Sequence, residues 1–214
     1  GTAKTICAPS DTWFPKAHFL QLMSNEELAQ YSCRYSENTS QSELELFHFG
    51  KSCIRINPKI HKDCQNLEAF IAKRLAKQLK GRPRLMQSKN QAYSDQSTPL
   101  ISIVYKSSLA AFAGATNTIP DNGRFRINIV VDGGDAFTEE SLIGEKIKLG
   151  GALLFVKKPV GRCAAINVDP TTAFRSDCDF VAFMKKKFGH SNLGIFAEVL
   201  NGGSINVGDP LLQN

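Results

Sequence analysis

The sequence predicts a mainly β or α+β protein, with a small β-rich N-terminal subdomain followed by a β-barrel that has a few peripheral helices. Short alternating or apolar segments recur along the 214 residues, glycine-rich turns separate many of them, and only two or three segments have helical periodicity. Because the strand-like segments do not alternate regularly with helices, we do not expect a doubly wound parallel sheet.

The N-terminal part is expected to contain one long helix and several short strands. Residues 43–49 alternate apolar and polar side chains, which indicates a half-buried strand, and Gly50-Lys51 turns the chain into a partner strand. The clearest helix is predicted over 66–79, because Asn66 is a good N-cap, an apolar stripe follows and Gly81 ends it. Residues 36–42 are typical of a polar turn. Strands are predicted at residues 18–23, 43–49, 52–56 and 85–87.

The C-terminal part is expected to hold a larger number of strands. Gly150-Gly151 and Asn201-Gly202-Gly203 are typical of hairpin turns, and each lies between two apolar segments. A brief helix is predicted from Ser107 or Ser108 to Ala113, and an amphipathic helix from Asp179 to Phe188. Strands are predicted at residues 100–104, 125–131, 146–149, 152–156, 195–200 and 204–207.

Composition and charge limit the possible functions. Hydrophobic residues make up 42% of the chain and charged residues 21%, as in an ordinary globular protein. The net charge of +6 permits an anionic ligand, but it is not concentrated into arms, so we expect no nucleic-acid partner. No apolar run has membrane length, so no membrane partner is expected either. The six cysteines have no zinc spacing, and a reducing, cytoplasmic location is the simplest expectation.

Common catalytic motifs do not account for the chain. It contains no GxSxG, no P-loop and no GxGxxG motif, which argues against hydrolase and nucleotide-fold readings. The four histidines are scattered, and His61 three residues before Cys64 is poor evidence for a zinc site.

One cysteine has a distinctive setting. Cys163 directly follows Arg162, shortly after the apolar run at 152–156 and six residues before the Asp169-Pro170 turn. A thiol beside a fixed positive charge is biased toward the thiolate, which attacks electrophiles and binds soft metals. An Arg-Cys pair alone is weak evidence, and a buried packing thiol is the alternative interpretation.

Four ordered segments resemble the MOSC domain, the module shared by molybdenum-cofactor sulfurases and the amidoxime-reducing proteins. The stretch Arg124–Gly133 is similar to the family's Phe-Arg-Pro-Asn-Ile-Val segment, with Ile127 in place of the proline. Val160 and Ala173 also depart from the family, which commonly has a cysteine and a glycine there. The other segments are Asp95–Leu100 with Ser107–Leu109, Gly161–Cys163 with Val168–Pro170 and Thr172, and Leu193–Phe196 with Ile205–Pro210.

The resemblance implies two domains. Residues 1–89 would form a partial MOSC N-terminal β-barrel-like region, and residues 90–214 the MOSC domain itself. The family's usual opening is a Tyr-Pro-Val-Lys-Ser segment followed by an Arg-Trp pair, which helps to hold the anionic end of the cofactor. That opening is missing here, so either the chain is shortened or this member has lost that part of the pocket.

The resemblance also implies a role for Cys163. Molybdenum held by the sulfurs of a pterin dithiolene is a soft centre, and Cys163 would be its protein ligand and a catalytic residue. Arg162 would favour the thiolate and offset the negative charge of the molybdenum-pterin cofactor.

Further cofactor contacts are expected from polar residues of the same segments. If the chain is extended from Arg124 onward, Arg124, Arg126 and Asn128 would share one face; we assign Arg126 and Asn128 to the pocket and Arg124 to the surface. Ser97 and Thr98 precede a proline and are candidates for contacts with the pterin, with a plain turn as the alternative. Asp169 is either the side chain that forms a turn or an acid near the metal.

The leading hypothesis is therefore a molybdenum-dependent oxidoreductase that resembles the amidoxime-reducing proteins. It would reduce a small N-hydroxylated substrate at a cysteine-ligated molybdenum. Because the chain has no iron–sulfur motif, the electrons would come from a separate electron-transfer protein.

Two alternatives remain open. In the first, Cys163 carries sulfur or docks the cofactor for sulfuration, as the C-terminal MOSC part of cofactor sulfurases would. The pyridoxal-phosphate desulfurase part of those enzymes is not expected in this chain, so the sulfur would have to be generated elsewhere. In the second, the chain is a non-catalytic barrel that keeps the fold without the cofactor.

Overall fold

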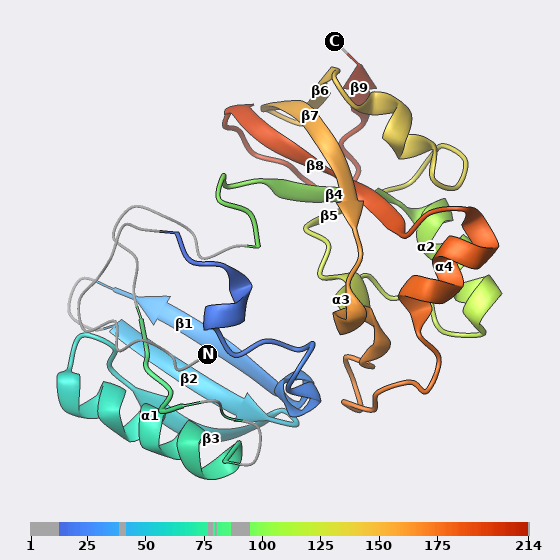
Figure 1. Cartoon of the computed structure of the whole chain (residues 1–214). Coiled ribbons are helices and arrows are strands. Elements are labelled where there is room, and N and C mark those ends of the chain that lie inside the picture. Colours follow the sequence, from blue (N-terminus) through green and yellow to red (C-terminus); the bar gives the residue numbers. More distant parts are fainter. Residues whose placement is uncertain (1–12, 39–41, 77–78, 80, 87–94, 214) are drawn as a thin grey trace. The chain divides into compact units, whose positions relative to one another are not determined.

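The computed structural model describes residues 13–38, 42–76, 79, 81–86 and 95–213, and it divides into two compact units (Figure 1). Unit 1 consists of the residues up to Ser97 together with Val168–Arg175, and unit 2 of Thr98–Asn167 and Ser176–Asn214. The predicted domain boundary between residues 89 and 90 lies outside the described residues. Within the described part, every helix is too short or too polar to cross a bilayer.

Unit 1 is built on a three-stranded antiparallel sheet in the order β1-β2-β3. Its strands are β1 (Tyr31–Glu37), β2 (Ser42–His48) and β3 (Lys51–Ile56). The predicted strands at 43–49 and 52–56 are confirmed. The first strand was not predicted, because almost all of its side chains are exposed and it has no apolar alternation.

The helix of unit 1 begins earlier than the sequence suggested. The helix α1 spans His61–Arg74, so Asn66 lies inside it and Leu75, not Gly81, follows its end. Asp63 explains the early start, because its Oδ2 accepts the Asn57 N–H at 2.9 Å and stabilises the first turn.

Two short strands predicted in unit 1 are not found. The segment at 18–23 holds the end of the 3-10 helix η1 (Lys16–His18) and a turn, and the 3-10 helix η2 (Glu26–Gln30) follows. Residues 85–86 are irregular, and Gln87 lies outside the described residues.

Unit 2 contains a six-stranded mixed sheet in the order β5-β4-β8-β7-β6-β9, in which only β4 and β5 are parallel. This sheet and a few helices make the fold a mixed α+β fold, as predicted. The strands are β4 (Ile101–Tyr105), β5 (Ile129–Val131), β6 (Lys146–Leu149), β7 (Ala152–Gly161), β8 (Asn192–Asn201) and β9 (Leu211–Gln213).

The hairpin predictions in unit 2 had different outcomes. Leu149 pairs with Ala152 across Gly150-Gly151, so the first hairpin is confirmed. Residues 204–207 form no strand, and β8 pairs with β4 and β7 instead, so the second hairpin is wrong. The short strand β9, at the edge beyond β6, was not predicted.

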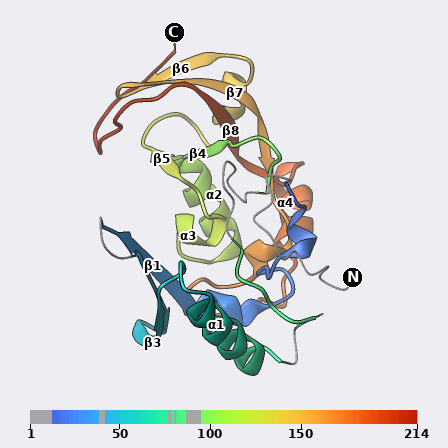
Figure 2. The ribbon, with the colours of Figure 1, turned by 90° about the vertical axis from the view of Figure 1, so that its left-hand side faces the viewer.

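Helices pack on the unit 2 sheet around two apolar cores. In Figure 2 the sheet is bent, and α2 and α3 lie on the side toward which it bends. One core joins β4, β6, β7 and β8 to η3 through residues such as Leu142 and Ile147, and the other joins Phe112, Phe125 and Met184 of the α-helices. The helices are α2 (Lys106–Thr116), α3 (Asn122–Phe125), η3 (Thr138–Leu142), η4 (Ala164–Asn167) and α4 (Phe180–Phe188).

The prediction of a strand over 125–131 is mostly wrong. Only Ile129–Val131 is extended, whereas Asn122–Phe125 forms a helical turn and Arg126 has a left-handed backbone with φ of 53°. The cause is Asp121, whose carboxylate accepts the Gly123 N–H at 2.7 Å and caps the turn. The shared strand face assumed for Arg124, Arg126 and Asn128 therefore does not exist.

Candidate functional site

Cys163 lies in unit 2 between the end of β7 and the start of η4, and its side chain is half-buried. The backbone around it is fixed from both sides. The Arg162 N–H donates to the Ser191 carbonyl at 2.9 Å, and the Cys163 carbonyl accepts the Ile166 N–H at 3.1 Å. The thiol is thus held in a defined place that is neither fully buried nor fully exposed.

The guanidinium of Arg162 bonds to backbone carbonyls. Its Nε and Nη2 donate to the Leu193 carbonyl and its Nη1 donates to the Phe125 carbonyl at 3.0 Å. The Phe125 ring centroid lies 5.3 Å from the guanidinium carbon. Burial lowers the pKa of Arg162 to about 10, while the negative charges of Cys163 and Glu139 act to raise it. Arg162 therefore remains a cation at neutral pH, beside Cys163.

A second cation, Arg124, is buried rather than on the surface. It is only 9% exposed, its Nη1 donates to the Ile166 carbonyl at 3.0 Å, and its guanidinium carbon lies 5.7 Å from the Phe180 ring centroid. Ile166 belongs to η4, directly after Cys163. The surface assignment of Arg124 was wrong because it rested on a strand that does not form there.

A buried carboxylate completes the polar network near Arg162. Glu139 is fully buried; its Oε2 accepts the Ser108 hydroxyl at 2.7 Å and its Oε1 accepts the Gly194 N–H at 3.2 Å. Gly194 has φ of +84°, and a Cβ there would lie 2.6 Å from the Ile103 carbonyl, so only glycine fits. Glu139 thus fixes the backbone beside Leu193, whose carbonyl receives Arg162.

The remaining predicted contacts of the MOSC-like segments are exposed. Arg126 follows the α3 turn with an exposed side chain, and Asn128 accepts both the backbone N–H and the hydroxyl of Ser102 at 2.9 Å through its Oδ1. Asn128 therefore ties β5 to β4. Ser97 and Thr98 are exposed in an irregular segment. Their roles as cofactor contacts stay predictions.

Asp169 forms a turn in unit 1. Its Oδ1 accepts the N–H groups of Thr171 and Thr172, each at 2.9 Å, and the Thr172 hydroxyl at 3.1 Å. This confirms the turn-forming interpretation, and the alternative role of an acid near the metal stays a prediction. In the same turn Ala173 is buried with φ of 61°, a backbone conformation that favours the glycine expected there.

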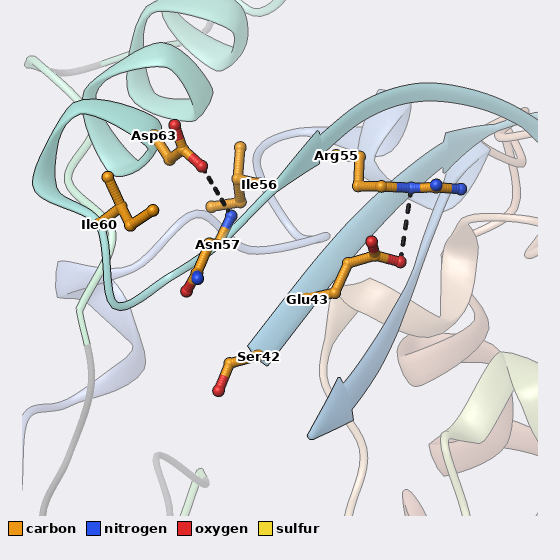
Figure 3. A pocket seen from close by; sticks show the side chains of 7 residues that line it. All are labelled: Ser42, Glu43, Arg55, Ile56, Asn57, Ile60 and Asp63. Atoms are coloured by element: carbon orange, nitrogen blue, oxygen red, sulfur yellow. Dashed lines mark hydrogen bonds and ion pairs between the residues drawn. The ribbon is translucent and has the colours of Figure 1, made fainter. Parts of the chain in front are cut away.

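Unit 1 also contains a polar pocket of about 330 Å³ between β2, β3 and the start of α1 (Figure 3). Its charges are paired internally: Arg55 Nε lies 3.4 Å from Glu43, and Asp63 bonds to the Asn57 backbone. The pocket therefore offers a ligand little uncompensated charge, and we do not choose it as the functional site.

Sequence reasoning assigned Arg124 to the surface, gave no role in the site to Ser108 and Gly194 although both lie in the MOSC-like segments, and did not single out Glu139. For Arg124, the Asp121-Asn122-Gly123 sequence was a usable signal of a capped turn. Glu139 is one of two adjacent glutamates in a polar stretch, and nothing in that pattern marks it as buried.

A sequence model described as the MOSC domain matches residues 90–212. The chain therefore belongs to the MOSC domain family, which is associated with molybdenum-cofactor binding and with cofactor sulfurases. No curated protein matches the chain.

Among solved structures, the chain is similar to YiiM from Geobacillus stearothermophilus, with 20% identity, a TM-score of 0.43 and coverage of 53% of each chain. YiiM from Escherichia coli has 20% identity, a TM-score of 0.40 and coverage of 53% of each chain. A hypothetical protein has 19% identity and a TM-score of 0.39, covering 59% of this chain and 56% of its own. The match thus spans about half the length of these proteins.

Proposed function

We propose that this chain binds a molybdenum-pterin cofactor with Cys163 as the protein ligand and reduces small N-hydroxylated substrates. The observation that carries the proposal is the placement of Cys163: a half-buried thiol, fixed by backbone hydrogen bonds on both sides, next to the half-buried cation Arg162. A reducing, cytoplasmic setting belongs to the same proposal, because Cys163 must remain a thiol or thiolate to act as a ligand.

The donor set fits such a cofactor. Among the described residues, no group of three or more His, Cys, Asp or Glu side chains could hold a metal ion by itself. A molybdenum already held by dithiolene sulfurs needs only one further soft protein donor, and one cysteine thiolate supplies it. The amidoxime-reducing subgroup is our choice within the family, on the segments described above.

The charges near Cys163 suit an anionic ligand. Arg162 directly precedes Cys163, Arg124 bonds to the Ile166 carbonyl in the η4 helix that follows it, and Glu139 is the buried carboxylate nearby. Because the guanidinium groups of both arginines already donate to backbone carbonyls, we expect them to act on the ligand through their positive charge and not through bidentate hydrogen bonds to a phosphate. Direct hydrogen bonds to the cofactor would come from exposed side chains such as Arg126, with Ser97, Thr98 and Asn128 as further contacts.

The proposed reaction converts an N–OH group into N–H and water, and it consumes two electrons and two protons. The cofactor would supply the two-electron redox chemistry. Cys163 would hold it, and Arg162 would keep that thiolate in place and balance its charge. The electrons would come from a separate electron-transfer protein.

The test is the molybdenum and pterin content of the protein made in a cofactor-competent host. We expect near-stoichiometric molybdenum in the wild type, its loss in Cys163→Ala, and retention in the matched control Cys178→Ala, whose thiol is exposed. Turnover of an N-hydroxylated substrate should then follow the molybdenum. Wild-type protein without molybdenum would overturn the proposal.

The half-buried position of Cys163 also favours one second candidate, the sulfur carrier. A carrier thiol must be accessible to a sulfur donor, and partial exposure allows this. This candidate predicts a persulfide on Cys163 after treatment with a sulfane-sulfur donor such as a low-molecular-weight persulfide, which leaves as its thiol, in protein that retains no molybdenum.

A further inference from the structure

The side of β6, β7 and β8 that faces away from the apolar core carries a group of lysines. We name it the lysine face, and it consists of Lys146, Lys148, Leu153, Phe155, Lys157 and Glu198. The strand register gathers these residues, because Lys146 pairs with Phe155 and Phe155 with Glu198, while Lys148 pairs with Leu153.

The alternation along the strands shows that this face is a solvent face. Ile147, Leu149, Leu154 and Val156 point to the opposite side, where they are at most 2% exposed. The lysines that alternate with these residues along the strands, Lys146, Lys148 and Lys157, are exposed.

The face has an excess of positive charge. Lys157 pairs with Glu198 at 3.3 Å, whereas no carboxylate in the described part of the chain lies within ion-pairing distance of Lys146 or Lys148. Half-buried Leu153 and Phe155 lie between the lysines, and Leu212 of β9, paired with Lys148, is 51% exposed. Across the sheet the row Leu153, Lys148, Leu212 therefore mixes apolar and cationic side chains on one solvent face. Protein–protein interfaces combine apolar and polar groups in the same way.

We propose that the lysine face docks a protein partner with an acidic surface. Charge complementarity supports this partner, since uncompensated lysines attract carboxylates and accelerate association of the two proteins. Single-stranded nucleic acid fits less well. It needs open rings for base stacking, but the aromatic ring of the lysine face is covered, because Lys157 Nζ lies 5.0 Å from the Phe155 centroid.

The test uses the full chain and poly-L-glutamate as a stand-in for an acidic surface. The test variant is Lys146→Gln/Lys148→Gln/Lys157→Gln. The matched control is Lys185→Gln/Lys186→Gln/Lys187→Gln at the exposed end of α4, which lowers the net charge from +6 to +3 equally. Binding is measured by fluorescence anisotropy at several salt concentrations, with circular dichroism to verify folding.

We expect salt-dependent binding by the wild type, a loss of about tenfold in affinity in the test variant and less than about threefold in the control. Equal losses in the two variants would overturn the proposal, and so would a wild type that does not bind. Tighter binding to oligothymidylate or to phosphatidylserine vesicles, lost in the same test variant, would also overturn it by assigning the face to nucleic acid or lipid. Because molybdenum content is not measured here, this outcome is independent of the proposed reaction.

Discussion

The surroundings of Cys163 in unit 2 and the Asp169 turn in unit 1 hold their polar groups in different ways. Around Cys163, buried and half-buried charged side chains bond to backbone groups far away in the sequence, as Arg162 does to Phe125 and Leu193. In the turn, Asp169 bonds to residues two and three positions further on, and an ion pair at the surface joins Arg175 to Glu26. The first arrangement depends on the whole unit, while the second is mostly local, so they should respond differently to substitution.

The largest effect is expected at Glu139. Glu139→Ala would leave the Ser108 hydroxyl and the Gly194 N–H buried without their acceptor, and we expect a loss of about 3 kcal/mol in the free energy of unfolding. Glu139→Gln keeps an acceptor and should lose about 1 kcal/mol. Denaturant unfolding of the full chain measures both, and equal losses would mean that the hydrogen bonds are not the cause.

Arg162→Lys should have the next largest effect. Lysine keeps the positive charge but has no planar fork to reach both the Phe125 and Leu193 carbonyls, so we expect a loss of about 2 kcal/mol and a lower molybdenum content. The control is Arg126→Lys, at an exposed position, which should change stability by less than about 0.5 kcal/mol. Similar losses in the two variants would contradict the structural role of Arg162.

In the Asp169 turn, the sharpest test concerns backbone conformation. Ala173→Val puts a β-branched side chain at φ of 61°, and we expect a loss of about 1.5 kcal/mol. Ala173→Gly should remain within about 0.5 kcal/mol of the wild type, because relief of strain offsets the lost methyl burial and the greater freedom of the unfolded chain. The melting temperatures of the two variants test this, because Ala173→Val should melt below Ala173→Gly. The opposite order would refute the prediction.

The smallest effect is expected at Glu26. The hydrogen bond from Arg175 lowers the pKa of Glu26, so its contribution to stability is present above the ordinary pKa of 4.5 and disappears as the pH falls through the lowered value. Glu26→Gln should therefore lose less than about 1 kcal/mol at pH 7 and nothing in stronger acid, since both partners are partly exposed. Unfolding curves recorded at successively lower pH from pH 7 show whether the difference between the two proteins shrinks once the pH is below 4.5.

The same contrast explains what the sequence could predict. Local patterns located the hairpin of β6 and β7, the pair β2 and β3, and the helix α4. They also identified Asp169 as the side chain of a turn. Each of these depends on residues only a few positions apart, so the sequence carries the signal.

The surroundings of Cys163 could not be predicted in the same way. Arg124 and Arg126 are two residues apart, yet the first is buried and the second exposed, because one capped turn ends between them. Glu139 lies 31 residues from Ser108 and 55 from Gly194, and pairings at such distances leave no periodic pattern. The sequence singled out Cys163 as the candidate thiol, but it did not predict which side chains surround it.

The membership of Val168–Arg175 in unit 1 has a consequence for biosynthesis. Arg175 donates to the carbonyls of Leu22 and Met23, although about 150 residues separate them. During synthesis from the N-terminus, the ribosome must therefore translate most of unit 2 before the last piece of unit 1 emerges. Unit 1 remains incomplete until then, so a gene fragment that stops at residue 97 would encode a sheet without the loop that bonds to its N-terminal segment.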